Sequence, residues 1–123
     1  MMGPVAEAHR WILHVGSREV ILQLRDQILR LHGFDVVSTL SMEEALAIFK
    51  GRPFDLVIVD VDGQGRVPLA ERLCSDIREL RPAQRVGFVR NYLVSIQSDC
   101  PDEIIQAEFN PAAFVDGVVR LLE

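Results

Sequence analysis

The stretch of sequence that decides the fold is Asp55-Leu56-Val57-Ile58-Val59-Asp60. Four consecutive apolar residues, most of them β-branched, lie between two acids. Such a run is too short for a buried helix and too continuous for a strand with one wet face. It predicts a central strand of a parallel sheet that is covered by helices on both sides. Because ligands bind at the carboxyl ends of such strands, Asp60 is the best-placed acid in the chain.

The rest of the chain alternates short apolar runs with segments of helical periodicity. Strands are predicted at 11–15, 34–38, 56–59, 86–89 and 104–105. Helices are predicted after them, from 17 to 33, 41 to 51, 68 to 80, 92 to 97 and 111 to 122, the fourth being weak. This repeated strand-helix order predicts a doubly wound α/β domain, with a five-stranded parallel sheet and helices on both faces.

Two helices carry local signals in addition to periodicity. In the first, Ser17 is a candidate N-cap, and apolar residues recur at helical spacing at Val20, Leu24, Ile28 and Leu31. In the second, Ser41 and Glu44 have the spacing of a capping box, in which each side chain satisfies an otherwise unpaired backbone amide.

Length and composition restrict the function classes. The chain has 123 residues, which we interpret as a loose leader at 1–9 and one domain at 10–123. A net charge of −5 argues against a nucleic-acid surface, and no apolar run approaches the length of a membrane helix. With no signal peptide recognisable, we expect a cytoplasmic protein. Cys74 and Cys100, with no close Cys or His partners, are expected to be buried thiols.

Polar residues near predicted strand ends are the candidate site residues. Two interpretations of Asp60 rest on its position alone: an anchor for Arg18 or Arg90, and a solvated acid. A third, a phosphoacceptor, is implied by the family resemblance given in the next paragraph. Asp62 is expected to form a turn beside Gly63 and is only a weak metal candidate, as is Asp60. His14, inside the first strand, is expected to be a hydrogen-bonded core histidine. No motif of an enzyme active site is recognisable.

The chain resembles the receiver domains of two-component response regulators from about Arg10 to Leu122. Three segments carry the resemblance: Phe54–Asp60, with Asp60 at the phosphoacceptor position, the helix opening Ser41–Leu46, and Phe109–Pro111 before the last helix. The resemblance implies the flavodoxin-like strand order 2-1-3-4-5. It also implies phosphoryl transfer to Asp60, supported by Mg²⁺.

Most residues that support this chemistry in receivers are replaced. Gly16 and Ser17 stand where receivers carry a pair of metal-binding acids, and Arg90 stands at the Ser or Thr position. Ile104 replaces the aromatic switch residue, and Ala107 replaces the lysine. By this resemblance the chain looks like a degenerate, or pseudo-, receiver, for which we expect no cofactor; Mg²⁺ is expected only if the site is functional.

Three functions compete. The first is a receiver-like signalling module that works by protein–protein interaction without Mg²⁺-dependent phosphorylation. The second is a working response regulator phosphorylated on Asp60, with Arg18 and Arg90 supplying charge. The third is a flavodoxin-like domain that binds a phosphate-bearing cofactor at the turn of Gly16 and Ser17. The partners expected are a kinase, a phosphotransfer protein or an output protein.

Apolar residues near the end of the chain predict an interaction surface. The predicted last helix has an apolar stripe broader than packing on a sheet requires, and the preceding weak helix is also apolar. In the family, the corresponding face is a common dimerisation surface. We therefore expect a protein partner, most simply a second copy, to contact Tyr92, Leu93, Val115 and Val119.

Overall fold

The computed structural model describes residues 10–106 and 111–123, so the predicted leader lies outside the described residues. The strands are β1 (Trp11–Val15), β2 (Asp35–Thr39), β3 (Leu56–Val61), β4 (Val86–Arg90) and β5 (Glu103–Gln106). The helices are α1 (Glu19–Leu31), α2 (Met42–Gly51), the short 3₁₀ helix η2 (Gln64–Arg66), α3 (Val67–Leu80) and α4 (Pro111–Leu122). None of these helices is long and apolar enough to span a bilayer.

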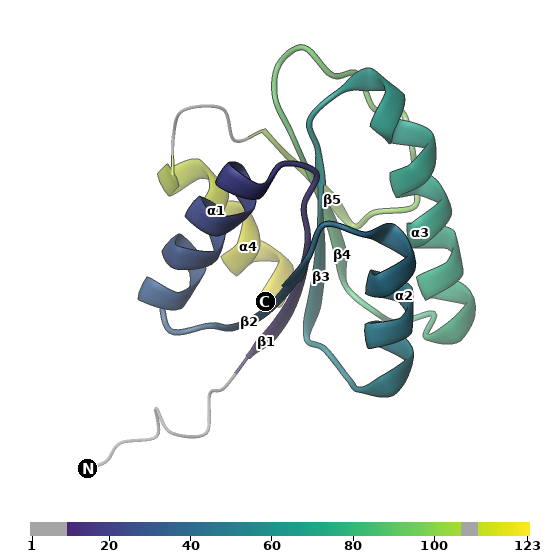
Figure 1. Cartoon of the computed structure of the whole chain (residues 1–123), viewed down its shortest axis with the longest axis horizontal. Helices are drawn as coiled ribbons and strands as arrows, with labels where there is room; N and C mark the ends of the chain where they lie inside the picture. Colours follow the sequence, from purple (N-terminus) through teal and green to yellow (C-terminus); the bar gives the residue numbers. More distant parts are fainter. Residues whose placement is uncertain (1–9, 107–110) are drawn as a thin grey trace.

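The sheet has the predicted topology. All strand pairs are parallel, and the strand order is β2-β1-β3-β4-β5, which confirms that β1, β3 and β4 are central. Helices α1 and α4 cover one face of the sheet, and α2 and α3 cover the other (Figure 1). Every residue of β3 is buried, as expected for a strand with helices on both sides.

Alternation along the central strands divides the core into two layers. In β3, Leu56 and Ile58 pack with residues of α1 and α4, whereas Val57 and Val59 pack with residues of α2 and α3. Successive side chains of a strand point to opposite faces, so Asp60 follows Leu56 and Ile58 toward the α1/α4 layer. This alternation decides which helices surround the candidate acid.

Helix α1 forms where predicted but buries a different face. The residues buried on it are Leu22 and Leu29. Val20 is 77% exposed and Leu31 is 84% exposed, although both belong to the predicted stripe. The helix carries apolar residues on more than one side, so periodicity alone was ambiguous. As a consequence, Arg25 and Asp26 lie on the partly buried side of α1, close to the candidate site.

The predicted helix caps are confirmed only in part. The Ser41 hydroxyl accepts a hydrogen bond from the Glu44 amide at 3.1 Å, as in a capping box. The Glu44 carboxylate accepts a hydrogen bond from the Thr39 hydroxyl instead of completing the box. Ser17 is not the N-cap of α1; that position is Arg18, which makes no side-chain capping bond. The Ser17 hydroxyl donates to Asp62.

Two predictions about the region around β4 are wrong. The weak helix at 92–97 does not form; between β4 and β5 the chain consists of turns and irregular structure. Instead of forming a helix, the segment is held by the packing of Val94 and Ile96 against the core layer under α2 and α3. Cys74 and Cys100 are not free thiols but a disulfide, which fastens this segment to α3.

Candidate functional site

Asp60 is the centre of the candidate site, and it lies inside the protein rather than in an open crevice. Its side chain is completely buried, with 0% relative exposure. A buried carboxylate is costly unless it is paired and hydrogen-bonded. The surrounding elements supply that pairing from β1 and α1.

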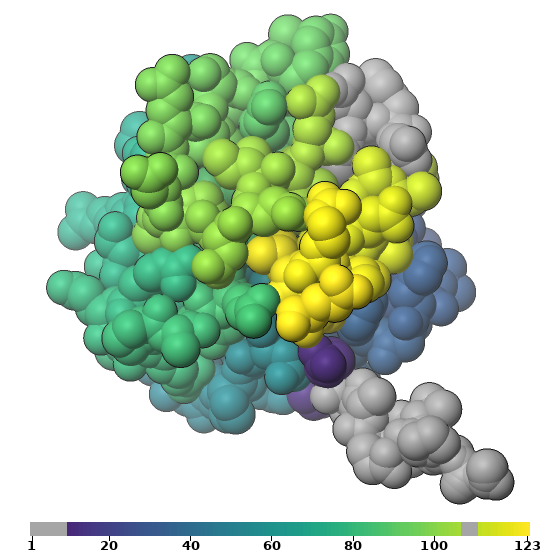
Figure 2. Space-filling view, turned by 180° about the vertical axis from the view of Figure 1, so that it is seen from behind, coloured from purple at the N-terminus to yellow at the C-terminus, as the bar shows by residue number. Residues whose placement is uncertain are grey.

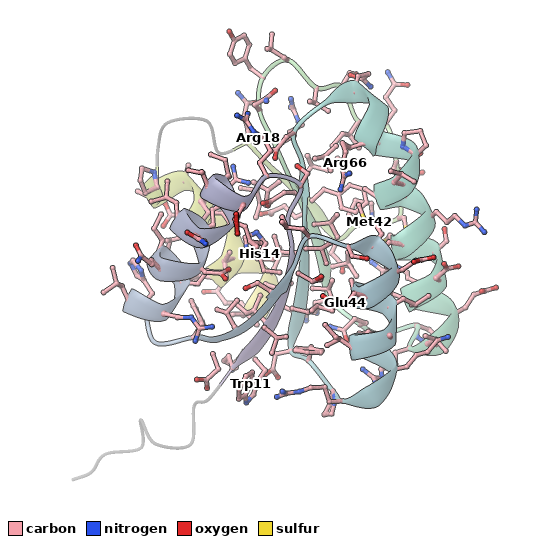
Figure 3. The ribbon with its side chains drawn as sticks, viewed as in Figure 1. Trp11, His14, Arg18, Met42, Glu44 and Arg66 are labelled. Atoms are coloured by element: carbon pink, nitrogen blue, oxygen red, sulfur yellow. A yellow bond between two sulfur atoms is a disulfide. The ribbon has the colours of Figure 1, made fainter. Side chains whose placement is uncertain are left out.

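His14 of β1 bridges two acids. Its Nε2 lies 3.0 Å from Asp60 Oδ2, and its Nδ1 lies 2.7 Å from Asp26 Oδ1. The side chain lies between the sheet and α1 (Figure 3). Two carboxylates accept from one imidazole only if both ring nitrogens carry protons, which is the imidazolium form. The predicted hydrogen-bonded core histidine is thus confirmed, with two acids as its partners.

Arg25 of α1 supplies the second cation. Its Nη1 lies 2.9 Å from Asp60 Oδ1, as an ion pair whose alignment falls short of a hydrogen bond. The same guanidinium lies 5.7 Å from the centroid of the Phe114 ring in α4. Both carboxylate oxygens of Asp60 are therefore in contact with a cationic group.

The network is completed by Ser38 of β2, whose hydroxyl donates to Asp26. Ser38 lies beside His14 in the paired strands β1 and β2. We call the set Arg25, Asp60, His14, Asp26 and Ser38 the buried charge network. It contains two acids and two basic groups, so its formal charges balance when His14 is protonated.

The network shifts the pKa values of its members. Burial alone lowers the pKa of His14, but the charge of Asp60 and the hydrogen bonds to Asp26 and Asp60 outweigh burial and raise the pKa to about 9. Burial raises the pKa of Asp26, but the hydrogen bonds from His14 and Ser38 outweigh it and lower the pKa below its ordinary value. At neutral pH, His14 is therefore charged and Asp26 is ionised.

The predicted cation partners of Asp60 are wrong. Arg90 Nη1 donates to the backbone oxygen of Val94 at 3.0 Å, within the segment that follows β4. Arg18 is exposed at the start of α1, above the network (Figure 3). Asp60 points beneath α1, so the cation that reaches it comes from the second turn of that helix and not from the strand ends.

The position of the first acid of a receiver site is occupied by Gly16, whose surroundings are filled by the Leu22 side chain. A Cβ atom added at Gly16 would lie 2.6 Å from Leu22 Cδ1 and 3.1 Å from Leu22 Cβ. Any side chain at this position would require Leu22, which is part of the core, to shift. Gly16 extends the pairing of β1 with β2, because its amide donates to the Thr39 carbonyl at 2.9 Å, and the chain then bends at Ser17 and Arg18 into α1.

The residues present do not fit a Mg²⁺ ion. Mg²⁺ requires near-octahedral oxygen ligands. Asp60 already contacts two cationic groups, and the Asp62 carboxylate accepts from Ser17. The Asp62 carbonyl, which aligns with a metal-binding carbonyl in receivers, lies 3.5 Å from Asn91 Nδ2 as a hydrogen-bond acceptor. Among the described residues, no group of three or more His, Cys, Asp or Glu is placed to hold a metal.

The remaining candidate residues are scattered. Ile104 is partly buried against the α2/α3 layer, and Ala107 lies outside the described residues. Of the interface candidates, Tyr92, Leu93 and Val119 are exposed. Val115 is only 8% exposed and belongs to the α1/α4 core, so it was wrongly placed at the surface. The apolar breadth of α4 is explained in part by contact with α1.

Sequence reasoning missed Arg25 and Asp26. One signal was available: His14 and Asp60 both lie on the α1 side if alternation is followed along β1 and β3. A histidine and an acid buried on the same face require charged partners from the helix that covers them. Adjacent charged residues in the middle of α1 meet that requirement, but only the helix orientation identifies them.

A second buried cation lies on the other side of the sheet. Arg66, at the end of η2, extends toward α2 near Met42 (Figure 3). Its Nε and Nη2 atoms are buried and have no hydrogen-bond acceptor within residues 10–106 and 111–123. An unsatisfied buried donor costs free energy, because it has lost water and gained no partner.

We expect Arg66→Met to raise the free energy of unfolding by about 1 kcal/mol, because methionine keeps much of the apolar stem and removes the unsatisfied donors. Urea unfolding measures the change. Arg72→Met, on the exposed side of α3, is the matched control and is expected to change stability by less than about 0.5 kcal/mol. A loss of stability in Arg66→Met would show that the guanidinium has a stabilising partner.

Comparison with known proteins places the fold. No protein-family model matches the sequence, and no curated protein is similar to it. Response regulator TrrA of Thermotoga maritima, in complex with Mg²⁺-BeF, is 24% identical, with a TM-score of 0.77 over 92% of this chain and 99% of that chain. Chemotaxis protein CheY4 of Vibrio cholerae is 19% identical, with a TM-score of 0.77 over 94% and 100%.

A CheY-like receiver domain protein of Methanospirillum hungatei is 23% identical, with a TM-score of 0.77 over 94% of each chain. These similar structures are all receiver domains, and they match in strand order as well as in extent. The chain therefore has the flavodoxin-like fold of response-regulator receiver domains.

Proposed function

We propose that this protein is a receiver-fold signalling module that acts through protein–protein contacts and is not phosphorylated on Asp60. The observation that carries the proposal is the buried charge network. Asp60 is completely buried, and His14 and Arg25 contact both of its oxygens. A phosphoryl donor must reach one of these oxygens, and in this conformation neither is accessible.

Catalytic support for phosphoryl transfer is also missing from the described residues. Such transfer depends on positioning and on compensation of the phosphate charge. Gly16 stands in place of a metal-binding acid, with the Leu22 side chain against it, and Arg90 is directed to the following segment. His14 and Arg25 do carry positive charge, but they neutralise Asp60 and Asp26 rather than an incoming phosphate. These features favour a pseudo-receiver with no metal and no enzymatic activity.

The partner that we propose is another signalling protein, in the cytoplasm. The support is the fold: TrrA has been solved in complex with the histidine kinase ThkA, and that TrrA structure aligns with a TM-score of 0.78 and 24% identity. The exposed Tyr92, Leu93 and Val119 remain candidates for a contact surface, including a homodimer. Dimerisation stays a prediction.

A second function has one observation in its favour. TrrA of the same fold has been solved with Mg²⁺-BeF. A working phosphoacceptor on this chain would require Asp60 to leave Arg25 and His14 and then to bind a metal without the acids that Gly16 and Ser17 replace. The cost of separating these charges favours the first function.

We expect no covalent phosphorylation when the intact protein is incubated with acetyl phosphate and Mg²⁺. Intact mass spectrometry measures the addition of one phosphoryl group, and a receiver domain known to accept phosphate is the positive control. A mass increase in the wild type that is lost in Asp60→Asn would establish the phosphoacceptor function instead. An increase retained in Asp60→Asn would indicate modification elsewhere.

A further inference from the structure

The Cys74–Cys100 disulfide joins two parts of the chain that are 26 residues apart. Cys74 lies in α3 and is completely buried, whereas Cys100 is partly exposed in the β4–β5 segment (residues 91–102). The two Cα atoms are 6.2 Å apart, within the usual range for a disulfide. These are the only two cysteines of the sequence, so no third thiol can exchange with them.

The β4–β5 segment has little structure of its own to hold it in place. It contains no helix or strand, and such segments have low local stability. Its tip exposes Tyr92 and Leu93, with relative exposures of 63% and 73%. The segment forms surface between α3 and α4 (Figure 2).

Besides the disulfide, several non-covalent contacts hold the segment in place. Val94 is buried in the α2/α3 core layer, where Ile96 also packs. Ser95 and Gln64 exchange two hydrogen bonds, of 2.8 and 2.9 Å. At the other end, Arg78 of α3 donates to the Cys100 carbonyl from Nε at 2.8 Å and from Nη2 at 2.6 Å. Arg78 thus holds the backbone of the same residue that the disulfide ties down.

We propose that Cys74 and Cys100 form a reversible redox site, whose reduction by a dithiol releases the β4–β5 segment from α3. The reductant's thiolate attacks the sulfur of Cys100, and Cys74 leaves as a thiolate and takes up a proton. The reductant's second thiolate then attacks the reductant sulfur that is bonded to Cys100 in the mixed disulfide. Cys100 leaves as a thiolate and takes up a proton. The protein gains two electrons and two protons, and the reductant becomes a disulfide.

Burial explains the order of these steps. Attack takes place at the accessible sulfur, and Cys100 is the partly exposed member of the pair. Once the bond is broken, no covalent link joins the segment to α3. What remains is the packing of Val94 and Ile96 and non-covalent bonds, chiefly those with Gln64, Arg78 and Arg90 and those of Asp102 at the start of β5. Opening then uncovers apolar surface of α3 around Cys74, so the redox state decides which surface the protein presents at Tyr92 and Leu93.

The test uses the whole chain, with and without dithiothreitol as the dithiol. Under native conditions we expect iodoacetamide to label no cysteine before reduction and both cysteines after it. Hydrogen exchange of amides in residues 91–102 is expected to become at least about tenfold faster after reduction, while the amides of β1 and β3 remain protected. Reoxidation with oxidised glutathione should restore the slow exchange.

Cys74→Ala/Cys100→Ala is the matched control. It should show the fast exchange in residues 91–102 at all times and no response to dithiothreitol. Labelling before reduction would show that the bond does not form, and resistance to dithiothreitol in the native state would show a purely structural bond. Loss of protection throughout β1 and β3, or an unchanged exchange rate in residues 91–102, would equally overturn the proposal.

Discussion

Arg25→Met is expected to lower the free energy of unfolding by about 3–5 kcal/mol, because it removes one partner of a buried ion pair. Asp60 would remain completely buried with His14 as its only charged partner in the network. The loss would reflect the cost of an uncompensated charge more than the strength of the pair itself. Equilibrium unfolding in urea measures the change.

The control for this prediction is Arg18→Met. Arg18 is exposed, and its substitution is expected to change stability by less than about 0.5 kcal/mol. The double variant Arg25→Met/Asp60→Leu removes both charges and should be more stable than Arg25→Met alone. With Asp60→Leu as the other single variant, the double-mutant cycle gives the coupling energy. A loss of less than about 1 kcal/mol in Arg25→Met would contradict the assigned pairing.

Stability is also expected to fall by about 3 kcal/mol as the pH rises from about 6.5 to about 9, because of His14. The pKa of His14 is raised in the folded protein from 6.5 to about 9. The folded state therefore holds the proton more tightly than the unfolded state does. This contribution is fully present below pH 6.5 and disappears as the pH passes through the folded pKa.

Urea unfolding at a series of pH values measures this dependence. His14→Gln, which lacks the titrating group, is expected to be less stable near neutral pH and to lose the slope in this window. Asp26 has a lowered pKa, so its contribution to stability depends on pH in the acidic range. This contribution is present above the unfolded pKa of Asp26 and is lost as the pH falls through the folded pKa. A flat wild-type curve between about pH 6.5 and about 9 would show that His14 is not held as an imidazolium.

Both predictions test the buried charge network, on which the proposed function rests. Under the proposed function, the charges that stabilise Asp60 in the core also keep it away from a phosphoryl donor. Arg25 reaches Asp60 from α1, and His14 reaches it from the neighbouring strand β1. A signal that passes through this protein would then depend on its surface, where the β4–β5 segment is the part fastened by a reducible bond.

The sequence by itself determined the fold class, whereas the strand order was expected only from the resemblance to receiver domains and agrees with the observed sheet. The continuous apolar run of β3 and the alternation of strands with helices depend on local patterns, which are short-range and can be read along the chain. The same patterns located Asp60 near the end of a central strand. That Gly16 and Ser17 stand in place of two acids followed from the resemblance to receiver domains. These features needed no knowledge of which distant residues meet.

The partners of Asp60 and the disulfide were decided only by the tertiary structure. His14 and Asp60 are 46 residues apart, and they meet because β1 and β3 are neighbours in the sheet. Arg25 reaches Asp60 because α1 turns Leu22 and Leu29 to the core and leaves Val20, Leu24 and Leu31 exposed. Helical periodicity allowed either face, and only the packing of α1 on the folded sheet decides that Arg25 and Asp26 lie on the partly buried side.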